Sequence, residues 1–200
     1  MGKSRGNFDL NTWLWWIALT AVGNVTAVII ISLVGGLLGA ALAGASGDDG
    51  STTFAQLAAI APVFALAGAV LGASQWLMLR RYIQRAGWWI GATAAGWMAG
   101  YLWSLLLFPP GSDTSPNLAL WLLFLFIGLA SGSCQWLLMR LQFERASIWI
   151  AVAIGSMAIA SAGLMLGGIR GLAIFWLPAA ALNGWVLLRL PRKESMKAEG

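Results

Sequence analysis

Six long apolar segments constrain this chain more than any other feature of its sequence. They run over residues 13–34 (with a Gly/Ala-rich extension to 45), 54–79, 88–108, 118–139, 148–166 and 172–190. A helix needs about 20 mostly apolar residues to cross a membrane, whereas a membrane β-strand alternates in polarity over about 10 residues. Because these runs are continuous and long, we predict an all-α integral membrane protein with six transmembrane helices.

The composition agrees with this prediction. Hydrophobic residues make up 60% of the chain and charged residues only 10%, whereas a soluble domain carries about 25% charged residues. The chain therefore has too few charges to cover a globular surface. A net charge of +5 would suggest a nucleic-acid partner for a soluble protein. In a membrane protein we interpret this charge as a topology signal, and we expect no nucleic acid.

The basic residues between the segments predict the orientation. If the N-terminus lies in the cytoplasm, 11 of the 12 basic residues are cytoplasmic, and only Arg170 lies outside, together with Asp48, Asp49 and Asp113. Cytoplasmic loops carry an excess of Lys and Arg, so both termini are predicted to be cytoplasmic. Residues 1–12 and 191–200 would then flank a single membrane domain over 13–190.

The N-terminus also has features of a cleavable signal peptide. Lys3 and Arg5 precede the first apolar run, and Ala-Leu-Ala at 41–43 resembles a small-residue cleavage site. The run is longer than the roughly 7–15 residues of a signal-peptide core, so we expect the first helix to be retained.

A motif recurs at a spacing of 60 residues. Residues 68–80 and 128–140 share two glycines, a Gln, a Trp and an Arg in the pattern GxxxGxxQWLxxR. The match continues past the apolar segment, where Gln-Arg-Ala at 84–86 corresponds to Glu-Arg-Ala at 144–146. We therefore predict a repeating unit of a helix, a short basic turn and a second helix.

The two ends of the chain resemble the halves of a third unit. Residues 183–189 match the helix before the turn, with Gly184 in place of Gln, and residues 15–23 match the helix after it. We therefore predict a closed bundle with approximate threefold pseudosymmetry, because internal repeats are common in membrane folds. Its hairpins would span about 60–108 and 118–167, and the third would be split between 172–190 and 13–34.

Polar and aromatic residues inside the segments are candidate ligand contacts. Gln75 and Gln135 lie just inside the basic boundary, and Asn183 lies close to the corresponding position of the third unit. Such amides either hydrogen-bond between helices, which is worth about 0.6–2 kcal/mol in a membrane, or bind a head group, pigment or substrate. Trp97 and Trp103 lie deeper in the third segment and could line a cavity.

Glycine pairs are predicted to mark helix contacts, because a residue without a Cβ lets two helices approach closely. Dimerisation through one such face is the alternative. The pairs in the repeated motif are Gly68 with Gly72 and Gly128 with Gly132, and further pairs occur at 96/100 and 163/167.

Trp and Arg residues gather at the predicted cytoplasmic boundary. The pattern Trp-x-x-x-Arg occurs at 76/80, 136/140 and 185/189, and a spacing of four places each Arg over its Trp on one helix face. An interfacial aromatic belt explains these residues without a ligand. The alternative is recognition of anionic lipids by the arginines of the turns. Those arginines are Arg80, Arg81, Arg85, Arg140 and Arg145.

The chain lacks the residues that several classes of chemistry usually require. The chain has no His and one Cys, and no Asp, Glu, Lys or Arg lies in the middle of an apolar segment. Ionisable residues at the midplane typically mark proton relays and ion pathways, and His and Cys are the usual zinc ligands. We therefore expect no enzyme activity, no catalytic residue, no metal and no cofactor.

The repeated GxxxGxxQWLxxR hairpin, with the basic turn that follows it, resembles an uncharacterised family of bacterial multi-pass membrane proteins of cyanobacterial or Chloroflexi-like type. The resemblance covers residues 60–160 best. It implies a bacterial inner membrane or thylakoid membrane and no particular activity. Six spans in about 200 residues also resemble, more distantly, the substrate-binding subunits of vitamin-uptake importers.

Two functions are compatible with these features. The first is a non-catalytic structural or accessory subunit, with the lipid bilayer and either another membrane protein or a second copy of this chain as partners. The second is a lipid-, pigment- or small-ligand-binding protein or transport subunit with a Gln/Trp site between helices. A large internal pocket that reaches these residues would favour the second function.

Overall fold

A computed structural model describes residues 10–44, 54–109 and 112–191, which form helices and no strand. Helix α1 (Leu10–Ile30) continues through a π-helical turn, η1 (Ile31–Gly35), into α2 (Gly36–Gly44). Helix α3 (Phe54–Ala58) precedes α4 (Ala61–Leu79). The remaining helices are α5 (Trp88–Leu107), α6 (Pro116–Met139) and α7 (Ile148–Arg189).

The six predicted spans are confirmed in the described part of the chain. Six helical segments are long and apolar enough to cross a membrane: 10–42, 56–79, 88–107, 116–139, 148–168 and 170–187. The last two are the arms of α7, separated by a sharp break. Gly167 and Gly168 leave the helical conformation there, and Gly168 adopts φ 56° and ψ −143°. This region of the backbone map is open essentially only to glycine, so the break lies where the sequence supplies a Gly pair.

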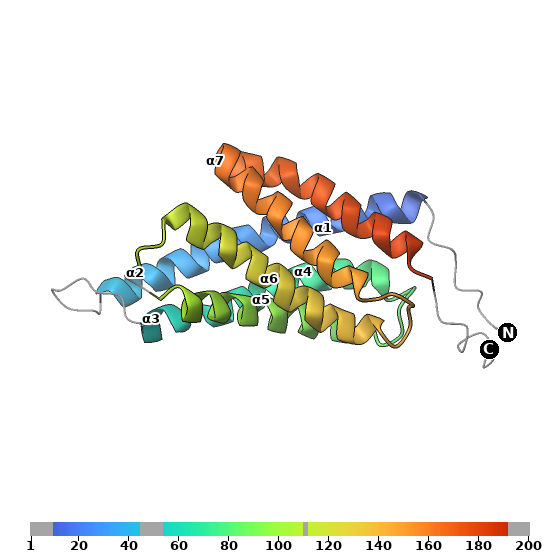
Figure 1. Cartoon of the computed structure of the whole chain (residues 1–200), viewed down its shortest axis with the longest axis horizontal. Coiled ribbons are helices and arrows are strands. Elements are labelled where there is room, and N and C mark those ends of the chain that lie inside the picture. Colours follow the sequence, from blue (N-terminus) through green and yellow to red (C-terminus); the bar gives the residue numbers. More distant parts are fainter. Residues whose placement is uncertain (1–9, 45–53, 110–111, 192–200) are drawn as a thin grey trace.

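Spans that follow one another in the chain are antiparallel neighbours in the bundle. Helices α4 and α5, α5 and α6, and α6 and α7 pack in sequence, and α1 packs against both α4 and α7. Two indole N–H groups of α1 reach the second arm of α7, Trp13 Nε1 donating to Ala181 O at 3.1 Å and Trp16 Nε1 to Ala180 O at 3.2 Å. The first and last spans are therefore in direct contact. In Figure 1, α1 and α7 lie together at one end of the molecule and diverge toward the other.

The end of the bundle at which α1 begins carries both basic turns. These turns cover residues 80–87 and 140–147, and the last described residue, Pro191, lies beside the second turn. We call this end the basic end. Lys3, Arg5, Asp48, Asp49, the basic residues after 191 and the extension beyond 44 lie outside the described residues.

Glycines lie where the backbones of neighbouring helices come closest. A Cβ built on Gly68 would lie 2.8 Å from Thr93 O, and one on Gly72 would lie 2.9 Å from Ile90 Cα, both across the α4–α5 contact. Across α6–α7, Gly128 and Gly132 have the same role. Their built Cβ atoms would lie 3.0 Å from Ile154 Cα and 2.7 Å from Ala153 Cβ. Ordinary Cβ contacts begin near 3.4 Å, so larger residues at these positions would push the helices apart.

The basic end has a dense aromatic core. Trp16, Trp89 and Trp149 are 0–2% exposed and belong to one cluster, in which Trp89 and Trp149 make an edge contact with ring centroids 5.7 Å apart. Phe143 and Ile83 extend the cluster into the two turns. These side chains fill the centre of the bundle at the basic end.

Candidate functional site

The two motif glutamines bind tryptophans of the helix that follows. Trp89 Nε1 donates to Gln75 Oε1 at 2.8 Å, and Trp149 Nε1 donates to Gln135 Oε1 at 2.8 Å. Gln135 also donates through Nε2 to Thr93 Oγ1 at 2.9 Å, which joins α6 to α5. Both glutamines are 6% exposed. Their carbonyl oxygens are therefore occupied by partners within the chain, as expected of hydrogen bonds that join helices.

Asn183 bonds to partners within α7. Its Nδ2 donates to Ser156 Oγ at 2.8 Å and to Ala179 O at 3.0 Å. A glutamine at Gly184 would collide with α1, because even a Cβ there would lie 2.6 Å from Trp16 Cδ1. This contact explains why the last motif lacks its Gln.

Each Trp-x-x-x-Arg pattern forms a cation–π pair. The guanidinium carbons of Arg80, Arg140 and Arg189 lie 5.2, 5.3 and 5.2 Å from the ring centroids of Trp76, Trp136 and Trp185. The three arginines are exposed at the basic end. Their charged groups are thus held in place while remaining accessible.

The two basic turns share an unusual backbone conformation. Arg85 and Arg145 adopt φ values of 56° and 52°, and each lies three residues before the next helix. Both side chains are exposed. A positive φ is uncommon for a residue with a Cβ, so its occurrence at both sites indicates that the two turns are built alike.

Hydrogen bonds connect the turns to one another and to the chain ends. The Gln142 side chain accepts from Gln84 N at 2.8 Å and donates to Gln84 O at 3.1 Å. Glu144 N donates to Pro191 O at 2.9 Å. The hydroxyls of Tyr82 and Thr12 lie 3.0 Å apart. The basic end is therefore one connected layer.

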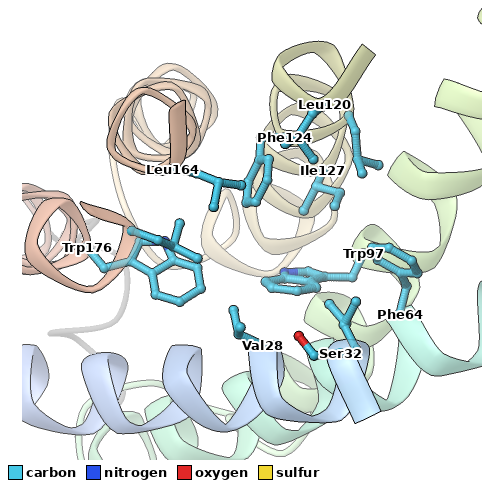
Figure 2. Close-up of a pocket in the computed structure, with 12 residues that line it drawn as sticks. Val28, Ser32, Phe64, Trp97, Leu120, Phe124, Ile127, Leu164 and Trp176 are labelled. Atoms are coloured by element: carbon cyan, nitrogen blue, oxygen red, sulfur yellow. The ribbon is translucent and has the colours of Figure 1, made fainter. Parts of the chain in front are cut away.

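A cavity of about 230 Å³ lies between the six spans, away from this layer. Each span contributes at least one lining residue, and the lining is almost entirely apolar. The residues are Val28, Ile31, Ser32, Phe64, Trp97, Leu120, Leu123, Phe124, Ile127, Leu164, Leu172 and Trp176. Figure 2 shows the Trp97 indole extending across the middle of this space toward Trp176.

Trp97 lines the cavity and carries an unused donor. The side chain is 3% exposed, and its Nε1 has no hydrogen-bond partner within the described residues. Two other buried atoms, Thr20 Oγ1 and Asn24 Oδ1, also lack a hydrogen-bond partner among the described residues. A buried donor without a partner costs about 1–3 kcal/mol, so Trp97 is the residue at which a bound acceptor would gain most.

The structure separates residues that the sequence suggested as one site. Trp97 lines the cavity, whereas Gln75, Gln135 and Asn183 do not. Trp103 is 48% exposed and stacks on Phe126 on the outside of the bundle. Trp176 and the α1 residues were not predicted from the sequence. Their positions depend on the break at 167–168 and on the wider turn of η1, and the Gly pair is the only visible signal of the break.

No group of three His, Cys, Asp or Glu side chains that could hold a metal occurs among the residues the structure describes. Comparison of the chain with protein families, with curated proteins and with solved structures finds no match. The family resemblance of the repeated hairpin therefore stays a prediction.

Proposed function

We propose that this chain is a multi-pass membrane protein that binds a small apolar molecule with an acceptor oxygen in the cavity beside Trp97. The observation that supports this most is the unpartnered indole N–H of Trp97, a residue that lines an otherwise apolar space of about 230 Å³. An apolar cavity of about 150 Å³ is large enough to bind benzene. The space thus suits an aromatic ring with a carbonyl group, or the end of a lipid chain that carries one.

The lining supports the chemistry of this ligand. Trp176 and Phe64 supply aromatic surface that is removed from water, and burial of apolar area contributes about 25 cal/mol per Å². A carbonyl group bound to Trp97 Nε1 would orient the ligand, because polar groups in mostly apolar pockets fix orientation. A charged ligand would find no partner among the lining residues.

The cavity is partly open, and residues of α1, η1 and α7 border it. These are the elements that diverge away from the basic end (Figure 1). The π-helical turn brings Ile31 and Ser32 to the cavity, and such turns often occur at functional sites. We therefore propose that the ligand enters between α1 and α7 from the surrounding lipid.

We also propose that the basic end is cytoplasmic and that the bundle has approximate threefold pseudosymmetry. The exposed arginines at one end agree with the positive-inside rule. The Gln–Trp bonds at a spacing of 60 residues and the contact of α1 with α7 support the symmetry. A bacterial inner or thylakoid membrane is the setting that the family resemblance suggests.

The test is NMR spectroscopy of the indole N–H groups in the purified chain in micelles. Acetophenone has one ring and a carbonyl, and α-methylstyrene has the same shape without the acceptor. We expect acetophenone to shift one indole N–H signal, that signal to be absent in Trp97→Phe, and α-methylstyrene to shift it far less. Trp103→Phe, in the same helix but outside the cavity, is the matched control and should leave the response unchanged.

If neither compound moves the Trp97 signal, ligand binding in the cavity is contradicted. The structural or accessory role expected from the sequence would then be the better interpretation, and co-purification of a partner would be the next measurement. Equal shifts of all indole signals would indicate partition into the micelle, which also contradicts a specific site.

A further inference from the structure

A second cleft lies at the basic end, between the start of α1 and the first turn. It has a volume of about 450 Å³. Its lining includes Trp15 and Leu19 of α1, Leu77 of α4, and Arg80 and Arg81 of the turn. The cleft shares no lining residue with the cavity beside Trp97, so a ligand in the cleft does not require a ligand in the cavity.

The walls of this cleft combine two kinds of chemistry. Trp15 and Leu77 are 59% and 45% exposed. Their side chains provide an apolar surface at the basic end of the bundle. Arg80 and Arg81 are exposed beside it, and no Asp or Glu among the residues that the structure describes lines the cleft. An apolar wall that ends in two adjacent cations fits a molecule with an acyl chain and an anionic head.

Arg80, one of the two cations, is held in place before anything binds. Arg80 lies over Trp76 at 5.2 Å, so the stacked guanidinium retains its edge for hydrogen bonds. Tyr82 and Thr12 also line the cleft, and the 3.0 Å contact of their hydroxyls joins the turn to α1. Arginine binds phosphate through two parallel N–H groups, and fixing its position beforehand lowers the entropy lost on binding.

We propose that this cleft binds the phosphate of an anionic phospholipid, with one acyl chain against Trp15, Leu19 and Leu77. Arg80 and Arg81 contact the phosphate, and the lipid belongs to the leaflet at the basic end. Basic pockets between transmembrane helices are known to hold anionic head groups. The occupant is a whole lipid because the apolar wall would stay uncovered with a free phosphate.

The second repeat supplies natural controls. Arg140 matches Arg80 in the repeated motif and stacks on its own Trp at 5.3 Å, but it does not line this cleft. At the position that matches Arg81, the second turn has Leu141, which is 68% exposed. Arg81→Leu therefore gives the first turn a residue that the second turn already accommodates. A smaller cleft of about 170 Å³ at Arg145 and Arg189 also excludes Arg140.

The experiment is native mass spectrometry of the full chain in detergent, titrated with phosphatidylglycerol or with phosphatidylcholine of the same acyl chains. We expect the wild-type chain to retain phosphatidylglycerol preferentially. A basic residue near an anionic lipid surface is worth about a fivefold change in affinity, so Arg81→Leu should weaken binding about fivefold. Adding Arg80→Gln should weaken it further, whereas Arg140→Gln should stay close to wild type. Circular dichroism melting curves check that each variant is folded.

Three results would overturn the proposal. Equal loss in Arg140→Gln would show a general effect of charge. Equal retention of phosphatidylcholine, whose phosphate is neutralised by its choline group, would show that the site does not select an anionic lipid. Glycerol 3-phosphate that competes at the affinity of the lipid would identify the occupant as a soluble phosphate. If Arg81→Leu fails to fold, Arg80→Gln alone decides the question against Arg140→Gln.

Discussion

Gly100 provides the strictest test of how closely the helices pack. A Cβ built on this residue would lie 2.5 Å from Ile127 Cα and 2.6 Å from Ile127 N. Both are backbone atoms of α6, which cannot rotate away as a side chain could. Gly91 lies in the same helix α5, and nothing lies within 4 Å of its built Cβ. The pair therefore tests the same substitution, Gly→Ala, with and without a neighbouring helix.

The size of the effect follows from the separation that the new methyl group requires. Ordinary contacts begin at 3.4 Å, so α5 and α6 would have to move apart by about 0.9 Å at Gly100. A gap of 0.5–1 Å loses about a quarter to a half of the dispersion attraction, and overpacking costs about 1–3 kcal/mol. Alanine favours a helix over glycine by about 1 kcal/mol, so Gly100→Ala should lower the free energy of unfolding by up to about 2 kcal/mol.

Gly91→Ala should instead raise the free energy of unfolding by about 0.5–1 kcal/mol, because only the helix propensity changes. Reversible unfolding by sodium dodecyl sulfate in mixed micelles, followed by circular dichroism, measures both. The two variants should shift the midpoint in opposite directions. The same shift for both would refute the close packing of α5 on α6 and indicate that Gly100 meets lipid.

Two further predictions concern the hydrogen bonds and the break in α7. A double-mutant cycle of Gln135→Leu and Trp149→Phe should give a coupling energy of about 0.6–2 kcal/mol in the same unfolding assay; no coupling would show that the 2.8 Å bond does not contribute to stability. Gly168→Ala should destabilise the chain by about 1–3 kcal/mol, because φ 56° with ψ −143° is open essentially only to glycine. Its neighbour Gly167 has φ −143° and no neighbouring atom within 4 Å, so Gly167→Ala should be nearly neutral; equal effects would contradict the break.

Much of the fold is predictable because its signals are local. Pro116 begins α6 with Ser115 as its N-cap, two residues before the predicted segment. Helix α5 begins at Trp88 and ends one residue before the predicted boundary. These boundaries follow from polar turns and apolar runs that neighbouring residues set. The Trp–Arg stacks are similarly local, since a spacing of four places both side chains on one face.

The candidate site was less predictable, because its parts come from different helices. Gln135 and Trp97 both carry a polar group within an apolar segment, and the sequence presents them as equivalent candidates. In the structure Gln135 forms hydrogen bonds with Trp149 and Thr93, whereas Trp97 Nε1 forms none with the described residues. That difference depends on which side chains of another helix come within hydrogen-bond distance.

The amino-acid pattern alone specifies six apolar spans, two basic turns and the glycine faces, because each arises from residues close together in the chain. Only the tertiary structure establishes that α1 packs against the second arm of α7 and that a cavity remains beside Trp97. A cavity is the space left when side chains of all six spans have packed. Its position therefore depends on the sum of contacts between distant segments, which no local pattern contains.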